Sequence, residues 1–253
     1  MANPDYDSRL SVQGTGEALV LVPGMDGTGQ LFYRQTPSLA ESFRTATYAL
    51  RSNATTMDTL VHDLARVVDT VAPETRRAVI VGESFGGALA MSFALARPEQ
   101  VSALVVLNSF PYFVPQFRLR LARYGLALLP WGAMLLIRRA TAFRLHSAHT
   151  HREEIRRFME LTASADREGY INRLQVLLSY DIRHRLHDLR PPALFLAAEH
   201  DHLVPSIQQA ELMVSRVPRG TLRVLHGHGH ICLIAPDVCL RDILVPWLKT
   251  AAL

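Results

Sequence analysis

One stretch of the chain combines a buried strand, a sharp turn and a helix. An apolar run that ends at Val81 stops at the letters GESFGG, and apolar residues then resume with helical spacing up to Phe93. Strands that are apolar throughout are typical of parallel sheets, whose two faces are both covered by helices. Gly82 and Gly86 flank Ser84, and a tight strand-to-helix turn needs such small residues because its backbone segments approach closely. The stretch therefore predicts an α/β fold that presents a serine at the apex of a turn.

The same buried-strand pattern recurs along the chain. Short apolar runs of this kind lie at residues 17–24, 44–50, 101–109, 192–201 and 221–227. Between them, helical spacing of apolar residues covers 57–71, and further helices are expected at 86–97 and 206–216. Strands that alternate with helices over this length predict a mostly parallel central sheet with helices on both faces.

One segment breaks this alternation. About eighty residues of helical character separate Ser109 from Pro192, far more than an ordinary connection of about two to six residues. The Pro191-Pro192 pair marks a return to the core, because the residue before a proline disfavours helix. We therefore expect a core formed by residues 1–110 and 190–253, and a helical cap inserted at 111–189, before the strand that ends near Asp201.

Composition limits the class of protein. The chain has 253 residues, of which 49% are hydrophobic, enough for one domain with a sizeable core. The N-terminal residues lack a basic-then-apolar signal, and the longest apolar run, 124–137, is short for a membrane span and contains Pro130. Cys232 and Cys239 are the only cysteines, so a disulfide framework is not expected. These features predict a soluble, cytoplasmic protein.

A serine hydroxyl becomes a useful nucleophile only when a base removes its proton, and that base needs a carboxylate to hold its tautomer. The letters AAEHDHLVP place Asp201 after a late strand, and LHGHGHICLIAP places His230 after the last one. Carboxyl ends of parallel strands meet at one edge of a sheet, where open α/β folds build their sites. The order predicts Ser84 as nucleophile, His230 as base and Asp201 as the partner of the base.

Over nearly its full length the chain resembles the α/β-hydrolase family. The resemblance is carried by the G-x-S-x-G turn at 82–86, the Asp-x-x-x-Pro loop at 201–205 and the pair Gly229-His230. It implies an α/β-hydrolase fold and a serine hydrolase that cleaves carboxylic esters through an acyl-enzyme intermediate, without a cofactor. The letters LVPGMDGTG and VGESFGGALA are similar to an esterase and acyltransferase group that includes phytyl ester synthases. That likeness implies hydrophobic substrates and leaves water or an alcohol as the acceptor.

Acyl transfer also needs N–H donors for the oxyanion. The resemblance implies one donor from the residue after the nucleophile, Phe85, and one from the loop after the early strand, Met25, with Asp26 as the alternative. Many relatives carry His-Gly before this second donor, whereas this chain has Pro23-Gly24. The same loop lacks the frame and the lysine of a phosphate-binding loop, so an oxyanion loop is the better interpretation.

Some of these residues also fit other kinds of site. His226, His228 and His230 alternate, which raises a metal site, but glycines interrupt the triplet and we expect no metal. Glu199 is an alternative acid at the wrong distance from Pro205 for the loop pattern. A non-catalytic ligand-binding member of the fold is the remaining alternative, because fold alone does not give function.

The cap is expected to bind the substrate, with Phe110, Phe113 and Trp131 in contact with it. From Val101 to Arg152 the chain has no Asp or Glu, and arginines lie among aromatic and aliphatic residues. Such a segment can roof an apolar pocket, or it can also rest on an anionic lipid surface. The expected partners are a small ester and, through the cap, a lipid surface. Nucleic acid is not expected, because the net charge of +4 comes without a basic stripe that carries interleaved aromatics.

Overall fold

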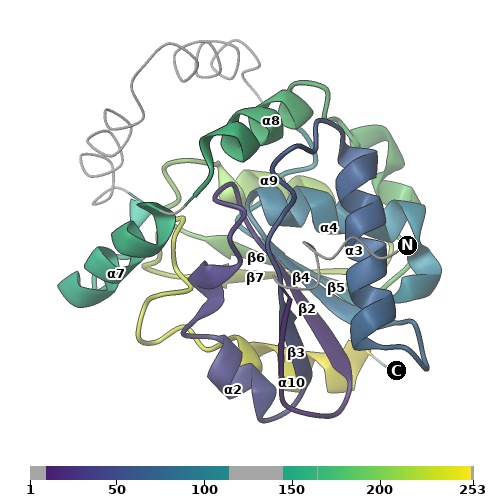
Figure 1. Cartoon of the computed structure of the whole chain (residues 1–253), viewed down its shortest axis with the longest axis horizontal. Helices are drawn as coiled ribbons and strands as arrows, with labels where there is room; N and C mark the ends of the chain where they lie inside the picture. The colour runs from purple at the N-terminus through teal and green to yellow at the C-terminus, as the bar shows by residue number, and fades with distance from the viewer. Residues whose placement is uncertain (1–9, 114–144, 164, 252–253) are drawn as a thin grey trace.

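The computed structural model describes residues 10–113, 145–163 and 165–251 (Figure 1). In this part of the chain, seven strands form one sheet in the order β1-β3-β2-β4-β5-β6-β7. The short edge strand β1 pairs antiparallel with β3, and every other neighbouring pair is parallel. The strands are β1 (Ser11–Gln13), β2 (Ala18–Val22), β3 (Arg44–Thr47), β4 (Ala78–Glu83), β5 (Val101–Leu107), β6 (Ala193–Ala198) and β7 (Gly220–Leu225).

Helices connect most of these strands. The α-helices are α2 (Thr36–Ala40), α3 (Met57–Val71), α4 (Phe85–Ala96), α7 (Arg152–Ala163), α8 (Arg167–Leu178), α9 (Ser206–Val214) and α10 (Leu240–Ala251). Short 3₁₀ segments are η1 (Gln30–Phe32), η2 (Pro98–Gln100) and η3 (Arg183–Asp188). The N-terminus of α3 is capped by Thr56, whose side chain accepts a hydrogen bond from the backbone N–H of Thr59.

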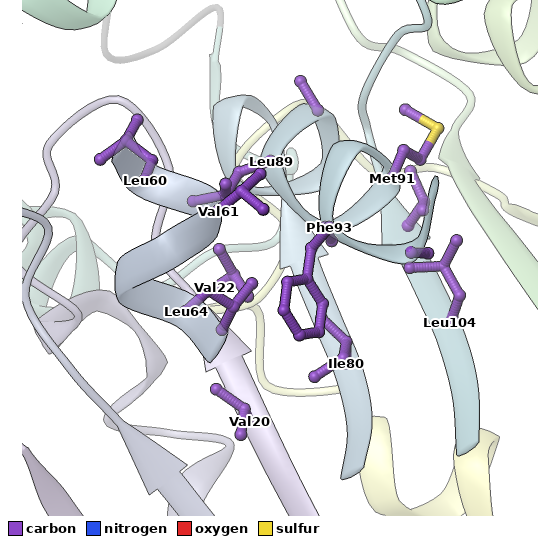
Figure 2. Close-up of a cluster of buried hydrophobic side chains, with 14 of the residues drawn as sticks. Val20, Val22, Leu60, Val61, Leu64, Ile80, Leu89, Met91, Phe93 and Leu104 are labelled. Atoms are coloured by element: carbon purple, nitrogen blue, oxygen red, sulfur yellow. The ribbon is translucent and has the colours of Figure 1, made fainter. Parts of the chain in front are cut away.

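One face of the sheet packs against α3, α4 and α9. Figure 2 shows the centre of this cluster, where Phe93 of α4 lies against Ile80 of β4 and Leu64 of α3 lies beside Val20 and Val22 of β2. All of these side chains are fully buried. Because successive residues of a strand point to opposite faces, Val20 and Val22 face this cluster while Leu19 and Leu21 face the other side.

The opposite face packs against α2 and α10. Leu19 and Leu21 of β2 contact this second cluster, to which α2 contributes Leu39 and α10 contributes Ile243 and Leu244. Figure 1 shows α2 and α10 together at the lower side of the view, away from α3 and α4. The sheet is thus buried on both faces, which is why its central strands are apolar at nearly every position.

The predicted α/β-hydrolase architecture is confirmed, and each strand expected from an apolar run is present in the sheet. Two elements had no clear signal. The strand β1 has only three residues, all exposed, and it exists because its backbone pairs with β3 rather than because its side chains are buried. The helix α10 carries Pro246 inside it, which obscures its helical pattern in the sequence.

The segment between β5 and β6 is helical where it is described. It includes α7, α8 and η3, and Figure 1 shows α8 along the upper side of the view and α7 at its left. Leu174 and Leu177 of α8 join the main core cluster, so this part of the predicted cap is anchored to the core. Trp131 and the arginines between 118 and 144 lie outside the described residues. Within the described part of the chain, none of the helices is long and apolar enough to cross a membrane.

Candidate active site

Ser84 occupies the turn between β4 and α4. Its backbone has φ of 55° and ψ of −118°, a conformation that non-glycine residues rarely adopt. A Cβ atom placed on Gly82 would lie 2.2 Å from the backbone oxygen of Gly86, so the turn tolerates no larger residue there. The strain and the close approach together present the Ser84 hydroxyl above the N-terminus of α4, as the sequence pattern predicts.

The structure brings the three predicted catalytic side chains together from separate loops. Asp201 follows β6 and His230 follows β7. The Nε2 atom of His230 lies 3.1 Å from Oγ of Ser84, and its Nδ1 atom lies 2.7 Å from Oδ2 of Asp201. His230 is only 4% exposed, so water does not compete for these hydrogen bonds. The arrangement can carry a proton from the serine to an imidazole whose tautomer the aspartate sets.

The loop that follows β6 holds the Asp201 carboxylate. Its Oδ1 atom accepts hydrogen bonds of 2.9 Å from the backbone N–H groups of Leu203 and Val204. Its Oδ2 atom accepts from the Ser206 hydroxyl as well as from His230. Burial by itself raises the pKa of this carboxyl, but the hydrogen bonds and the neighbouring imidazole outweigh it and hold the pKa below its ordinary value. Asp201 is therefore ionised at neutral pH.

The pKa of His230 is set by the same two effects with opposite signs. Burial lowers it, whereas the hydrogen bond to Asp201, the charge of Asp201 and the charge of Glu83 raise it. The net shift is upward. A base with a raised pKa takes a proton more readily, but it is neutral, and so ready to act, only at a higher pH.

The two predicted oxyanion donors belong to residues near Ser84, one that follows it directly and one that lines the same cavity. Phe85 is the first residue of α4, so its N–H group has no acceptor within the helix. Met25 follows β2 and lines the same cavity as Ser84. Arg173 of α8 holds the loop of Met25 from the cap side. Its Nε atom donates a hydrogen bond of 2.9 Å to the backbone oxygen of Met25, and its Nη2 atom donates one of 3.1 Å to the backbone oxygen of Asp26.

A cavity of about 280 Å³ opens beside Ser84 and His230. Its described lining is mostly apolar and includes Leu31, Phe32, Leu145, Phe158, Leu203, Ile231, Leu233 and Ile234. Phe110 and Phe113, which the sequence assigns to the substrate, are not among these lining residues. Their ring centroids lie 4.8 Å apart, and Phe110 is 3% exposed and also packs against Tyr180. They contribute to the core beside the cap, and the third predicted contact, Trp131, lies outside the described residues.

Sequence reasoning did not find Asn108, which holds the loop of His230 in place. Asn108 directly follows β5 and has a positive φ of 47°, and its side-chain amide donates a hydrogen bond of 2.7 Å to the backbone oxygen of His230. Its side-chain oxygen accepts from the backbone N–H of Ala198 at 2.8 Å. A polar residue directly after a buried strand was the available signal, but only the tertiary structure shows what it contacts.

The alternating histidines have separate partners. His226 lies 3.4 Å from a carboxylate oxygen of Glu199, which also accepts from the backbone N–H of Gly227 at 2.9 Å. Glu199, the alternative acid, is thus turned away from His230. Nδ1 of His228 lies 2.9 Å from the Ser147 hydroxyl, in a group outside the catalytic one.

In the described residues, one cluster has the composition of a metal site. It consists of His149, His228 and Asp237, with His149 and Asp237 exposed and joined by a hydrogen bond of 2.8 Å. His226 and His230 are not part of it, so the triplet seen in the sequence does not converge on one point.

The geometry agrees with comparisons with known proteins. The profile of the alpha/beta hydrolase family matches residues 19–241, which include the serine turn, the acid loop and the histidine loop. The chain belongs to the alpha/beta hydrolase family. The curated relatives include proteins named putative carbamate hydrolase RutD. The protein from Serratia proteamaculans is 28% identical, and the match covers 91% of this chain and 90% of the relative. The protein from Caulobacter sp. strain K31 is 26% identical, and the match covers 90% of this chain and 89% of the relative.

Solved structures of this hydrolase fold superpose closely. A thermophilic esterase from Thermogutta terrifontis has a TM-score of 0.85 at 21% identity, with 96% of this chain and 93% of that chain covered. An enol-lactonase from Burkholderia xenovorans LB400 has a TM-score of 0.79 at 17% identity, with 98% and 96% covered. These similarities establish the fold. The narrower likeness to phytyl ester synthases stays a prediction.

Proposed function

We propose that this hydrolase cleaves carboxylic esters with apolar chains through an acyl-enzyme intermediate on Ser84. The observation that carries the proposal is the continuous hydrogen-bonded chain from the Ser84 hydroxyl through His230 to Asp201. A purely ligand-binding protein has no need to bring these three groups from separate loops into this order. The proposal therefore favours an enzyme over a binding protein of the same fold.

The reaction follows from the positions of these groups. Neutral His230 takes the Ser84 proton on Nε2 as the serine oxygen attacks the ester carbonyl, and Asp201 stabilises the imidazolium that forms. The backbone N–H groups of Met25 and Phe85 donate to the oxyanion. His230 then gives its proton to the departing alkoxide, which leaves the acyl group on Ser84. A water molecule repeats the same steps in reverse and releases the acid.

The lining of the cavity supports apolar substrates. Each methylene that leaves water for this lining contributes about 0.8 kcal/mol, so longer chains gain binding energy until the cavity is filled. A short acetyl group leaves much of an apolar cavity of about 280 Å³ without contacts. We expect kcat/KM to rise from acetyl to medium-chain esters for this reason.

Carbamates are a second candidate substrate class. The relatives named putative carbamate hydrolase match about nine tenths of this chain, although at only 28% identity or less. A carbamate carbonyl is attacked by a serine in the same way as an ester carbonyl, and the same donors serve its oxyanion.

Transfer of the acyl group to an alcohol instead of water is the alternative that the sequence motifs support.

A labelling experiment separates enzyme from binding protein. A fluorophosphonate probe should label wild-type protein at Ser84 and should not label Ser84→Ala. Absence of labelling in folded wild-type protein would instead favour the binding protein.

Product analysis then separates the reactions. Aryl esters with acyl chains of increasing length and aryl carbamates are incubated with and without a long-chain alcohol. Free acid from esters supports the hydrolase, a new ester supports transfer, and preferential release of amine and carbon dioxide supports carbamate cleavage. A best rate on acetyl esters would contradict the preference for apolar chains.

A cytoplasmic location and contact of the cap with lipid are also proposals. The arginines and aromatic residues that suggest lipid contact lie largely outside the described residues, so the sequence alone supports it. Sedimentation with anionic and neutral vesicles at low and high salt tests it, because electrostatic binding to anionic lipid is screened by salt.

A further inference from the structure

The carboxyl group of Glu83 lies in the active-site cavity and has no role in the catalytic chain described above. Glu83 directly precedes Ser84, and it lines the cavity together with Ser84 and His230. Its side chain is only 15% exposed. Within the described residues its side chain forms no hydrogen bond, and Nε2 of His230 lies 3.9 Å from its Oε1 atom. A buried carboxyl group normally has a hydrogen-bond partner, so this one is available to a reactant.

The surrounding loop leaves space for this carboxyl group. A Cβ atom placed on Gly24 would lie only 2.7 Å from Oε2 of Glu83, so any side chain there would displace the carboxyl group. The absence of a side chain at Gly24, next to the oxyanion loop, therefore keeps Glu83 in its position facing the cavity.

Glu83 faces the side of the site where the leaving group departs and the acceptor enters. His230 delivers its proton to the leaving alkoxide from Nε2, and it later takes the proton of the attacking water or alcohol at the same atom. A carboxylate oxygen 3.9 Å from Nε2 is next to that position. A water oxygen at about 2.8 Å from both atoms would see them at an angle of roughly 90°, close enough to the angle between the two O–H bonds of water for both hydrogen bonds to form.

We propose that Glu83 orients the hydrolytic water by accepting its second hydrogen, and thereby favours water over an alcohol as the acceptor. Water has two hydrogens, one for Nε2 of His230 and one for Glu83, whereas an alcohol has a single hydroxyl hydrogen and places an alkyl group toward the carboxylate. The inference rests on the proposed acyl-enzyme function and concerns its second half.

The deacylation step balances without a net proton transfer to Glu83. The water oxygen bonds to the acyl carbon and its first proton moves to Nε2 of His230. The bond from the acyl carbon to Oγ of Ser84 then breaks, and the His230 proton returns to that oxygen. The second water proton stays on the product acid, and Glu83 only holds it in place during the attack.

The charge state of Glu83 adds a second readout. Burial raises the pKa of Glu83, the charge of His230 lowers it and the charges of Asp26 and Asp201 raise it, with a net value of about 7. The buried thiol of Cys232 is also nearby and stays neutral, because burial raises its pKa. Below pH 7 the Glu83 carboxyl is protonated and cannot accept the water hydrogen. The share of hydrolysis should therefore rise with pH, while titration of His230 affects both acceptors alike and cancels in their ratio.

The test measures how one acyl-enzyme partitions between two acceptors. Wild type, Glu83→Met, Glu83→Gln and Thr162→Val are incubated with p-nitrophenyl butyrate and a fixed concentration of methanol or hexan-1-ol, and butyric acid and butyrate ester are quantified. Both products come from the same intermediate, so partial loss of folded protein lowers them equally. Thr162→Val is the matched control, because it makes the same cavity more apolar away from His230; the Thr162 hydroxyl bonds to the backbone oxygen of Phe158.

We expect Glu83→Met to raise the ratio of ester to acid at least about tenfold with both alcohols, as the loss of one charge-assisted hydrogen bond predicts. Glu83→Gln should give a smaller rise of this ratio, and Thr162→Val should leave it unchanged. The ratio should fall as the pH rises from 6 to 8 only in the proteins that keep Glu83. A ratio within twofold of wild type in Glu83→Met would overturn the inference. A rise confined to hexan-1-ol would also overturn it, because that pattern reflects binding of the alkyl chain.

The outcome for wild type separates this inference from the proposed function. If wild type releases p-nitrophenol but the ratio of ester to acid is the same in wild type and Glu83→Met, the inference alone fails. If wild type releases none from any ester, the proposed function fails and the inference fails with it.

Discussion

The side-chain amide of Asn108 donates a hydrogen bond of 2.7 Å to the backbone oxygen of His230, 122 residues further along the chain. Asn108 also accepts from the backbone N–H of Ala198, so it joins the end of β5 to the loop of the catalytic base and to the end of β6. It is 1% exposed, and water cannot replace either bond. Asn108 thus acts as a positioning residue for His230.

Asn108→Ala should lower both kcat and stability. Two buried backbone groups lose their partners, at about 1–3 kcal/mol each, and the His230 loop is free to shift. Asn108→Asp keeps the acceptor for Ala198 but places a buried carboxylate oxygen against the backbone oxygen of His230, so stability and kcat should fall in this variant as well. Urea unfolding and steady-state kinetics on a medium-chain aryl ester measure the two effects. Full kcat in Asn108→Asp would argue against a positioning role.

Ser84→Ala and His230→Ala should each lower kcat by about 10⁴-fold or more, because the members of such a triad act as a unit. His228→Ala is the matched control. His228 is also buried and lies two residues away, but its ring bonds to Ser147 rather than to the catalytic serine. Aryl ester turnover measures all three. If His228→Ala were inactive and His230→Ala active, the base would be misassigned.

The activity should be lost at acidic pH with a midpoint above the ordinary histidine value of about 6.5. The folded pKa of His230 is raised, because its bond to Asp201 and the charges of Asp201 and Glu83 outweigh burial, and only the neutral imidazole can accept the Ser84 proton. The rate therefore falls as the pH drops through this raised pKa. Glu83→Gln removes one negative neighbour, so its midpoint should move to lower pH. A kcat/KM profile from pH 5.5 to 9 tests both claims, and equal midpoints would contradict the second.

Arg173→Met should lower kcat by about 10- to 100-fold with a smaller change in KM. The Arg173 side chain holds the backbone oxygens of Met25 and Asp26, and without it the oxyanion donor of Met25 is no longer fixed. Arg156→Met, an exposed arginine of α7, serves as the control and should behave as wild type. A selective rise in KM alone would indicate that Arg173 serves substrate binding rather than the oxyanion loop.

Glu83 should make the protein less stable as the pH rises. Its pKa increases from 4.5 to about 7 on folding, so between these values the folded state binds more protons than the unfolded state. The free energy of unfolding is therefore highest below the unfolded pKa of 4.5. It falls by about 3 kcal/mol in total as the pH rises through the folded pKa of about 7. Glu83→Gln removes the titration. Urea unfolding should show that the free energy of unfolding falls more between pH 5 and pH 8 in wild type than in Glu83→Gln. An equal fall in the two proteins would refute the buried-carboxyl interpretation.

Local sequence patterns determined most of the core and the choice of the candidate catalytic residues. An apolar run that is short and uninterrupted is a buried parallel strand wherever helices cover both faces, and β2, β4 and β5 follow this rule. Ser84 could be chosen as the candidate nucleophile because a strained turn requires glycines at fixed positions, and Gly82 and Gly86 are visible in the sequence around it. Asp201 and His230 could be found because each follows directly after a strand.

Contacts between distant segments were decided only by the tertiary structure. The contacts of Asn108, Arg173 and Glu83 could not be read from their neighbouring residues, because they depend on which loop ends beside them. The same reason separates His228 from His230: their sequence surroundings are alike, but the sheet and the acid loop bring only one of them to Asp201. The assignment of Phe110 and Phe113 to the substrate has the same weakness, since an aromatic residue after a strand can face a pocket or the core. Phe110 packs against Tyr180 in the core, and contact of the two residues with substrate stays a prediction.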